Sequence, residues 1–430
     1  MVRSLRRGQS WVVFLCALIV RLAATQLFQG LDAPPDAEAN PDQVEYEQFA
    51  HQLSIGNGYA RANGERTAAR PPGTSLTLAP VYWLLGHSYL FGRVFMCSLS
   101  ALTCVLAAAI ARSLFGRGVG WVAGIWLALY PGHFYYATHF LSEVVFGFWL
   151  CLSMWLFLRS FDRLRAKPAG IMNASLDRLE IVGCGAALGM AALTRPQFVL
   201  ILPFMTLCLL GRGSDLRRGL CMLAIQWIAA GSVILPWMIR NHSVLGRATI
   251  TTIGGYTFWG ANNETVLNDP RRIGSWIPVD SLIDDEHPVE GDEVERERAT
   301  YRHGMRFVRE HRADMPLLML MKLWRLLSPL RETSNFVVFL VFAVAWVITG
   351  PLVIAGLWMI ARSDRKAFLV LAVPLLVTLA TTLVYYGSIR FRDSVAPVFI
   401  LAAAYASWHV AHNLARRRDA HPLDSELQDS

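Results

Sequence analysis

Two acidic residues of this chain lie where a carboxylate could move a proton at a membrane surface. Asp42 opens the segment Pro41-Asp42-Gln43-Val44-Glu45-Tyr46, in which apolar and aromatic residues recur at positions 46, 49, 50 and 53 with helical spacing. One interpretation is structural: Asp42 is the N-cap of this helix, and Glu45 completes a pattern like a capping box. The other is chemical: the carboxylate takes a proton from an acceptor hydroxyl or amine. Both interpretations can hold together.

The second acid, Glu143, opens a long apolar stretch after His139-Phe140-Leu141-Ser142. An acid inside an apolar segment is costly, so its default interpretation is functional. The structural alternative is that Ser142 and Glu143 cap a helix. His133 and His139 fit interfacial histidines better, because the sequence places no paired His or Cys ligand at a metal-binding spacing beside them.

Arginines at the boundaries of apolar runs form a second group of candidates. They are Arg70 before Pro71-Pro72, Arg195 before Pro196, Arg240 before Asn241, and Arg390 and Arg392 before the last apolar run. A planar guanidinium suits contact with a phosphate. The structural alternatives are that Arg70 and Arg240 only reach to lipid headgroups, and that the last two arginines pair with Asp393. Arg195 interrupts an apolar run, which is tolerated where a polar cavity is lined, and this favours a function.

The composition places these residues in a membrane protein. Of 430 residues, 54% are hydrophobic and 17% are charged, against roughly 45–50% and about 25% in soluble domains. This excludes a disordered chain, a collagen and a disulfide-rich secreted module. The net charge of +8 comes from basic residues at the ends of apolar runs, so it indicates membrane topology and no nucleic-acid partner. Seven cysteines without a CxxC pair predict neither a disulfide framework nor a zinc site.

The apolar runs predict an all-α polytopic protein with about ten spans, since a bilayer core of ~30 Å needs about 20 residues of helix. Eight spans are expected near 11–28, 91–113, 118–136, 142–161, 219–237, 336–360, 368–386 and 392–412. The run 180–210 is expected to form two short spans that meet at Arg195-Pro196. Residues 73–86 and 315–327 are too short or too broken to span and predict interfacial helices.

Basic residues gather in every second loop, so these loops are predicted to be cytoplasmic together with both termini. The first span follows a basic start and predicts an uncleaved anchor. Segments 29–72 and 238–335 then lie outside. We expect a first module over 1–237, an extracytoplasmic region over 238–335, further spans over 336–412 and a cytoplasmic tail over 413–430. The expected location is a bacterial inner membrane.

Several short motifs together resemble the membrane glycosyltransferases of the GT-C class, in the group of the protein mannosyltransferases and the lipid A aminoarabinose transferase (glycosyltransferase family 39). The motifs run over nearly the whole chain: Asp42 with Tyr46, Gly56-Asn57-Gly58-Tyr59, Arg70-Pro71-Pro72, Ser142-Glu143, Thr194-Arg195-Pro196, Pro236-Trp237 with Arg240-Asn241, and Arg390-Phe391-Arg392. Each motif is short, and the specificity comes from their order.

The resemblance implies transfer of a sugar from a polyprenyl-phosphate donor to a protein, lipid or glycan acceptor at the outer face, with inversion. It implies Asp42 as the base, and Arg70, Arg195, Arg240 and Arg390 as contacts of the donor phosphate. Beside these, we select Glu143 as a second catalytic candidate and Tyr46, Asn241 and Arg392 as further candidates for substrate binding. Gln43 stands where many relatives carry a second acid, so no cofactor is assigned and a divalent metal ion stays open.

Other functions stay open beside this one. A secondary transporter or a flippase of a lipid-linked or anionic substrate would favour binding residues at the midplane and an internal repeat. The candidate charges gather instead at one predicted face, and no repeat is visible. A surface-polysaccharide ligase is an alternative within the same class.

Overall fold

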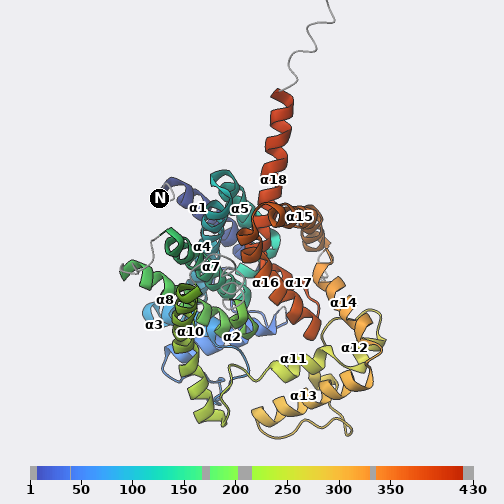
Figure 1. The fold of residues 1–430 in the computed structure, drawn as a ribbon. Coiled ribbons are helices and arrows are strands. Elements are labelled where there is room, and N and C mark those ends of the chain that lie inside the picture. The colour runs from blue at the N-terminus through green and yellow to red at the C-terminus, as the bar shows by residue number, and fades with distance from the viewer. Residues whose placement is uncertain (1–6, 39, 167–174, 202–215, 330–335, 420–430) are drawn as a thin grey trace, which may run out of the picture.

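The described part of the fold consists of helices joined by loops, the longest of which is 55–72 between α2 and α3 (Figure 1). The computed structural model describes residues 7–38, 40–166, 175–201, 216–329 and 336–419. The helices are α1 Arg7–Phe28, α2 Pro41–Ser54, α3 Gly73–Leu85, α4 Tyr89–Phe115, α5 Arg117–Leu129, α6 Pro131–Ala137, α7 Ser142–Ala166, α8 Ser175–Thr194, η1 Pro196–Leu200, α10 Leu216–Leu245, α11 Gly254–Ala261, α12 Glu264–Asn268, η2 Val279–Ser281, α13 Glu293–Glu310, α14 Met315–Leu327, α15 Phe336–Ser363, α16 Arg365–Val384, α17 Ile389–Ser394 and α18 Ala396–Asp419.

Six helices of the described residues are long and apolar enough to cross a membrane. They lie in α1, α4, α7, α10, α15 and α16. The all-α polytopic class is therefore confirmed, whereas the count of ten spans stays a prediction. The single span expected over 118–136 is wrong, because the helix stops at Leu129 and a new one begins at Pro131. Proline lacks an N–H and fixes its own φ, so it starts a helix more readily than it continues one.

A second break confirms the prediction at Arg195-Pro196. Helix α8 ends at Thr194, and the 3₁₀ helix η1 begins at Pro196. Most of the second short span expected in 180–210 falls on 202–215, outside the described residues. The basic residues Lys167 and Arg212 and the tail 420–430 also fall outside them.

The last predicted span, 392–412, is divided differently in the structure. Its first residues belong to the six-residue helix α17, which ends at Ser394, and the long helix α18 begins only at Ala396. Ser388 is the N-cap of α17 and accepts a hydrogen bond from the backbone N–H of Arg390. Arg390 and Arg392 therefore lie on a short helix of their own before the final long helix.

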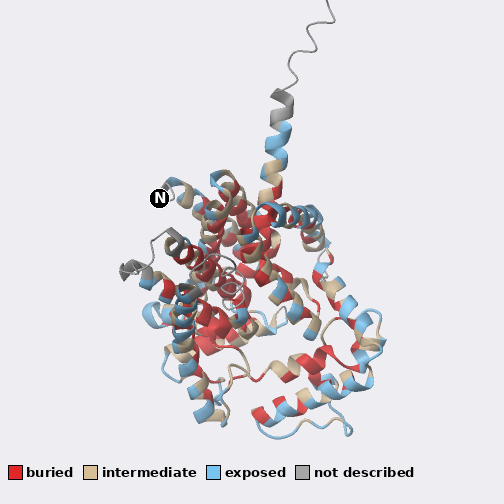
Figure 2. Ribbon diagram, in the orientation of Figure 1, coloured by how far each residue is buried: buried red, intermediate tan, exposed pale blue. Residues whose placement is uncertain are grey.

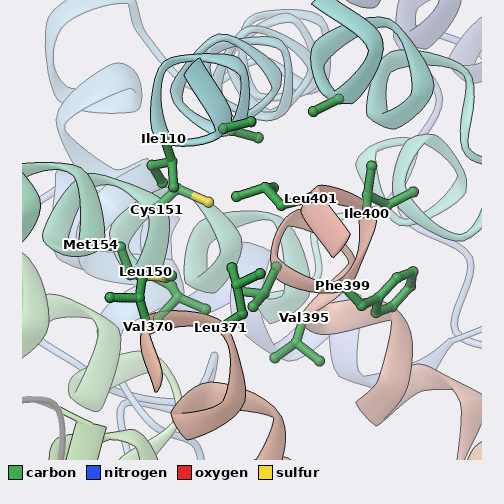
Figure 3. Packing of buried hydrophobic residues seen from close by; sticks show 14 of the residues in the cluster. Ile110, Leu150, Cys151, Met154, Val370, Leu371, Val395, Phe399, Ile400 and Leu401 are labelled. Atoms are coloured by element: carbon green, nitrogen blue, oxygen red, sulfur yellow. The ribbon is translucent and has the colours of Figure 1, made fainter. Parts of the chain in front are cut away.

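The main core lies between α1, α4, α5, α7, α16 and α18. Figure 3 shows Leu150 and Met154 of α7, Leu371 of α16, and Ile400 and Leu401 of α18 packed together. Buried residues concentrate in the middle of this bundle (Figure 2), while α15 exposes large apolar side chains such as Val347 and Ile354. Exposed apolar side chains on a long helix suit contact with lipid rather than with water.

Helices α11 to α13 form a separate layer at one end of the bundle, where the end of α10 also lies (Figure 1). Helix α18 projects from the opposite end. The charge-dense stretch 284–312 contains α13, which buries one face with Val294, Ala299 and Phe307. The predicted helices over 73–86 and 315–327 appear as α3 and α14. That this layer is extracytoplasmic stays a prediction.

Candidate functional site

Helix α2 positions Asp42 differently from the sequence prediction. The helix begins at Pro41, and its N-cap is Asn40, whose side chain makes no capping hydrogen bond. The prediction that Asp42 is the N-cap is therefore wrong. Pro41 is pre-organised for the first helical position, so the helix starts before Asp42. Asp42 becomes the second helical residue, and its carboxylate is free to bond to other elements.

Glu143 has the equivalent place in α7, which begins at Ser142. Both acids thus lie in the first turn of a helix, where the positive end of the helix dipole favours a negative charge. The helix dipole is a sufficient reason for an acid in each of these first turns. It does not explain why arginines from distant segments of the chain pair with both carboxylates.

Arg390 of α17 connects the two acids. Its Nη1 donates to Asp42 Oδ2 at 2.7 Å, and its Nε donates to Glu143 Oε1. Arg195, at the break after α8, donates from Nη2 to the same Glu143 oxygen at 2.8 Å. Asp42 and Arg390 are 348 positions apart in the sequence. The fold thus joins the starts of α2 and α7 to the break at Arg195 and to the short helix α17.

Arg70 completes the site from the loop that precedes α3. Its Nη2 lies 2.8 Å from Asp42 Oδ1, and its Nε donates to Glu45 Oε2. We call Asp42, Glu143, Arg70, Arg195 and Arg390 the acid–arginine cluster. Sequence reasoning gave Glu45 only a capping role. Its position one helical turn after Asp42 places both side chains on one face, and this spacing could have linked it to the site.

The arginines of the cluster stabilise the ionised form of Asp42. Burial alone would raise the pKa of this carboxyl group, but the charges of Arg390 and Arg70 outweigh it and lower the pKa to about 2. The acids in turn raise the pKa of both arginines despite their burial. Asp42 is therefore ionised at neutral pH, and each of its oxygens faces a charged guanidinium.

Solvent exposure divides the cluster into a front and a back. The side chains of Asp42, Arg70 and Arg390 are between 20% and 25% exposed, whereas Glu143 is 3% and Arg195 is 9% exposed. Solvent reaches the first three. Glu143 and Arg195 lie behind them, where the glutamate orients both Arg195 and Arg390.

Two tyrosines lie within electrostatic reach of the cluster. Tyr46, which the sequence analysis selected, is buried one turn after Asp42, and burial raises the pKa of its hydroxyl. Tyr386 was missed. Burial also raises its pKa, and its charge environment includes Arg390, Asp42, Arg195 and Glu143. Its ring centroid lies 4.6 Å from that of Phe391. Its position four residues before Arg390 was the available signal.

Arg240 and Asn241 have partners away from the cluster. Arg240 donates from Nη1 to the carbonyl of Thr67 and from Nη2 to the carbonyl of Tyr59, both at 2.7 Å. Its guanidinium stacks on Trp237, 4.9 Å from the ring centroid. Asn241 is buried and donates to the carbonyl of Thr249. These two residues hold the 59–67 loop against the end of α10, and a contact with substrate stays a prediction.

Arg392 also faces away from the cluster, in line with the structural alternative. Its Nε donates to Asp393 Oδ1 at 3.0 Å and its Nη1 to the carbonyl of Ser328 at 2.8 Å. The guanidinium lies 4.0 Å from the ring centroid of Trp346. With an exposed fraction of 4%, this arginine is part of the scaffold.

The donor set of the site does not fit a divalent metal ion. Within the described residues, no group of three or more His, Cys, Asp or Glu side chains could hold one. The carboxylates of Asp42 and Glu143 already face guanidinium groups, which supply the positive charge that a metal would bring. Gln43 next to Asp42 donates its amide to the carbonyl of Asp36.

Comparison with known proteins identifies the fold. No family model matches the chain, and no curated protein matches it. Among solved structures, the chain is similar to the oligosaccharyltransferase AglB of Archaeoglobus fulgidus in complex with an inhibitory peptide and a dolichol-phosphate, with a TM-score of 0.55 and 13% identity over 96% of this chain and 51% of AglB. A structure of an Archaeoglobus fulgidus oligosaccharyltransferase tethered with an acceptor peptide gives a TM-score of 0.56 with 12% identity, over 97% of this chain and 51% of that one.

A third similar structure is ArnT of Cupriavidus metallidurans bound to undecaprenyl phosphate, with a TM-score of 0.45 and 15% identity over 94% of this chain and 78% of ArnT. The chain spans about half the length of AglB. The likeness to AglB shows a shared fold, and it confirms the fold predicted from the resemblance to the GT-C class.

Proposed function

We propose that this protein is a GT-C glycosyltransferase that moves a sugar from a polyprenyl-phosphate donor to an acceptor at the extracytoplasmic face of a bacterial inner membrane. The observation that carries the proposal is Asp42, a partly exposed carboxylate at the start of α2 that lies between Arg70 and Arg390. The fold is shared with AglB, which was solved with an inhibitory peptide and a dolichol-phosphate, and with an oligosaccharyltransferase that was tethered with an acceptor peptide. A base beside two guanidiniums is what transfer from a phosphate donor requires.

The reaction is a single displacement at the anomeric carbon of the donor sugar. The acceptor's hydroxyl or amine attacks this carbon, and its proton passes to the carboxylate of Asp42. The bond from the anomeric carbon to the phosphate oxygen breaks, and the oxygen keeps the electron pair. Arg70 and Arg390 stabilise the charge that develops on the leaving phosphate, a type of stabilisation that is often the largest part of enzymatic rate enhancement. The sugar product has inverted configuration.

The geometry also suggests how Asp42 becomes a competent base. With a pKa of about 2, the carboxylate bound by two arginines accepts protons weakly. A donor phosphate competes for the same guanidiniums. As Arg390 and Arg70 turn towards the phosphate, Asp42 loses its stabilising partners and its pKa rises. Glu143, buried behind them, keeps Arg195 and the Nε of Arg390 in place.

The test is incubation of the purified protein in nanodiscs with a panel of polyprenyl-phosphate sugars and membrane-extracted acceptors. We expect consumption of one donor, release of free polyprenyl phosphate, and loss of both in Asp42→Asn. A flippase would move the donor across a vesicle bilayer without consuming it. If donors cross and none is consumed, the transferase proposal is wrong and transport is the better description.

A further inference from the structure

The segment that carries Arg70 is held by a residue of the α11–α13 layer. The carboxylate of Glu293 accepts hydrogen bonds from Thr67 Oγ1 at 2.7 Å, from the backbone N–H of Ala68 at 2.9 Å, and from Thr252 Oγ1. Thr67 and Ala68 are fully buried. Glu293 therefore accepts from the buried N–H of Ala68 and from the hydroxyl of Thr67, which itself accepts from the N–H of Ala69. A buried N–H left without an acceptor would cost free energy.

The direction of the Glu293 side chain is determined by the start of α13. Glu293 is the first residue of this helix, and Asp292 before it is the N-cap. Asp292 accepts from the N–H groups of Val294 and Glu295, and Glu295 Oε2 accepts from the N–H of Asp292, so the capping box is complete. A reciprocal cap of this kind fixes the helix start. The acid at the first position is thus directed at residues 67 and 68, 225 or more positions earlier in the chain.

Neighbouring bonds extend this hold to Arg70 itself. The N–H of Thr252 donates to the carbonyl of Ala68 at 3.0 Å, and Thr251 Oγ1 donates to the carbonyl of Ala69 at 3.2 Å. Tyr59 donates from its hydroxyl to the carbonyl of Arg70 at 3.1 Å. The following Pro71 and Pro72 restrict the backbone further. These hydrogen bonds hold the backbone of residues 67–70 in place, and from there the guanidinium of Arg70 reaches Asp42.

We infer that Glu293 is a positioning residue for the donor phosphate: it fixes residues 67–70 and through them places Arg70 beside Asp42. This inference rests on the proposed function for its kinetic consequence, since Arg70 is the group that would meet the phosphate. The α11–α13 layer thereby contributes to donor binding without touching the donor. Within the described residues, Glu293 makes no hydrogen bond or ion pair with the acid–arginine cluster, and it belongs to the scaffold around it.

The experiment compares Glu293→Ala and Glu293→Gln with the wild type and with Glu310→Ala. Glu310 is the matched control, an exposed glutamate on the same helix that pairs only at the surface with Arg306. Amide hydrogen exchange of the peptide 60–72 is measured first, because it reports the hold on this segment without any substrate. Donor KM, acceptor KM and kcat are then measured with the polyprenyl-phosphate sugar that the wild type consumes.

Glu293→Ala should speed exchange in 60–72 and raise the donor KM roughly tenfold, the scale of a lost hydrogen bond to a charged group. The acceptor KM should stay near the wild-type value. Glu293→Gln keeps one accepting oxygen, so its exchange rate in 60–72 and its donor KM should lie between those of the wild type and Glu293→Ala. Glu310→Ala should match the wild type in both. Unchanged exchange in Glu293→Ala, or faster exchange with an unchanged donor KM, would overturn the inference. If the wild type consumes no donor, the proposed function fails, and the exchange result still decides whether Glu293 holds this segment.

Discussion

Arg390 and Arg392 lie two residues apart on α17, and their surroundings have little in common. Residues two apart on a helix point to nearly opposite faces. Arg390 reaches Asp42 of α2 and Glu143 of α7, and a quarter of its side chain is exposed. Arg392 is buried against Trp346 and pairs with its own neighbour Asp393.

The two guanidinium groups differ in whether an incoming anion could replace their present partners. Arg390 holds two acids from distant helices and is partly exposed to solvent, so an incoming anion could compete for it under the proposed function. Arg392 has a buried acid, a backbone carbonyl and an aromatic ring as partners, and breaking these contacts would leave Asp393 charged and buried. The same residue type thus serves a site on one face of α17 and the scaffold on the other.

The strongest disruption of the site should come from Asp42→Asn. The helix remains, because Asn40 is the N-cap and Asp42 is the second residue. We expect normal folding and a loss of transfer of ~100-fold or more, the scale of a lost general base. The measurement is the turnover of a polyprenyl-phosphate sugar in nanodiscs. Glu38→Gln, an exposed acid of the same segment, is the control. Full turnover in Asp42→Asn would leave this carboxylate with a structural role only.

Arg390→Ala tests whether the arginine that faces the two acids contributes to donor binding. It removes the guanidinium that joins Asp42 to Glu143, so we expect the donor KM to rise roughly 30-fold or more. Arg390→Lys keeps the charge and loses the fork, and it should raise the donor KM by roughly three- to tenfold. Initial rates over a range of donor concentrations measure both. If both variants kept the donor KM of the wild type, the phosphate would bind elsewhere.

Arg392→Ala should have the opposite profile. Removing one partner of a buried ion pair costs ~3–5 kcal/mol, so we expect a lower midpoint of thermal unfolding. The donor KM of the folded fraction should stay within about twofold of the wild type. Thermal scans followed by size-exclusion chromatography give the stability, and kinetics on the monodisperse peak give the KM. A large rise in donor KM at unchanged stability would place Arg392 in the binding site after all.

The smallest expected effect concerns the pH dependence of kcat/KM, which reports on the free enzyme. The folded pKa of Asp42, about 2, lies below its unfolded value, so the stabilisation of its ionised form is complete above pH ~4 and is lost only as pH falls towards 2. Asp42 should therefore contribute no acid limb to kcat/KM between pH 5 and 8. In the donor complex the arginines bind phosphate, and the acid limb of kcat should lie at least about one unit higher. Coincident limbs in kcat and kcat/KM would argue against the exchange of arginines.

Much of the local structure could be predicted from the sequence. The apolar runs predict the long helices, Arg195-Pro196 predicts the break after α8, and 73–86 and 315–327 predict α3 and α14. The rules behind these predictions act over a few neighbouring residues. They failed at Asp42, where Pro41 moved the helix start, and at 118–136, where Pro131 divided the expected span.

The amino-acid sequence by itself determined the residue types of the site, with acids at the starts of two helices and arginines at the breaks. Only the tertiary structure decided their pairing. Arg70, Arg195 and Arg390 meet the acids, while Arg240 and Arg392 bind backbone carbonyls and neighbours, and Glu45, Tyr386 and Glu293 join the surroundings of the site. Helix periodicity and capping are local, whereas the bond from Arg390 to Asp42 joins residues 348 positions apart. Such a pair forms only when the packing of whole helices brings both ends to one place.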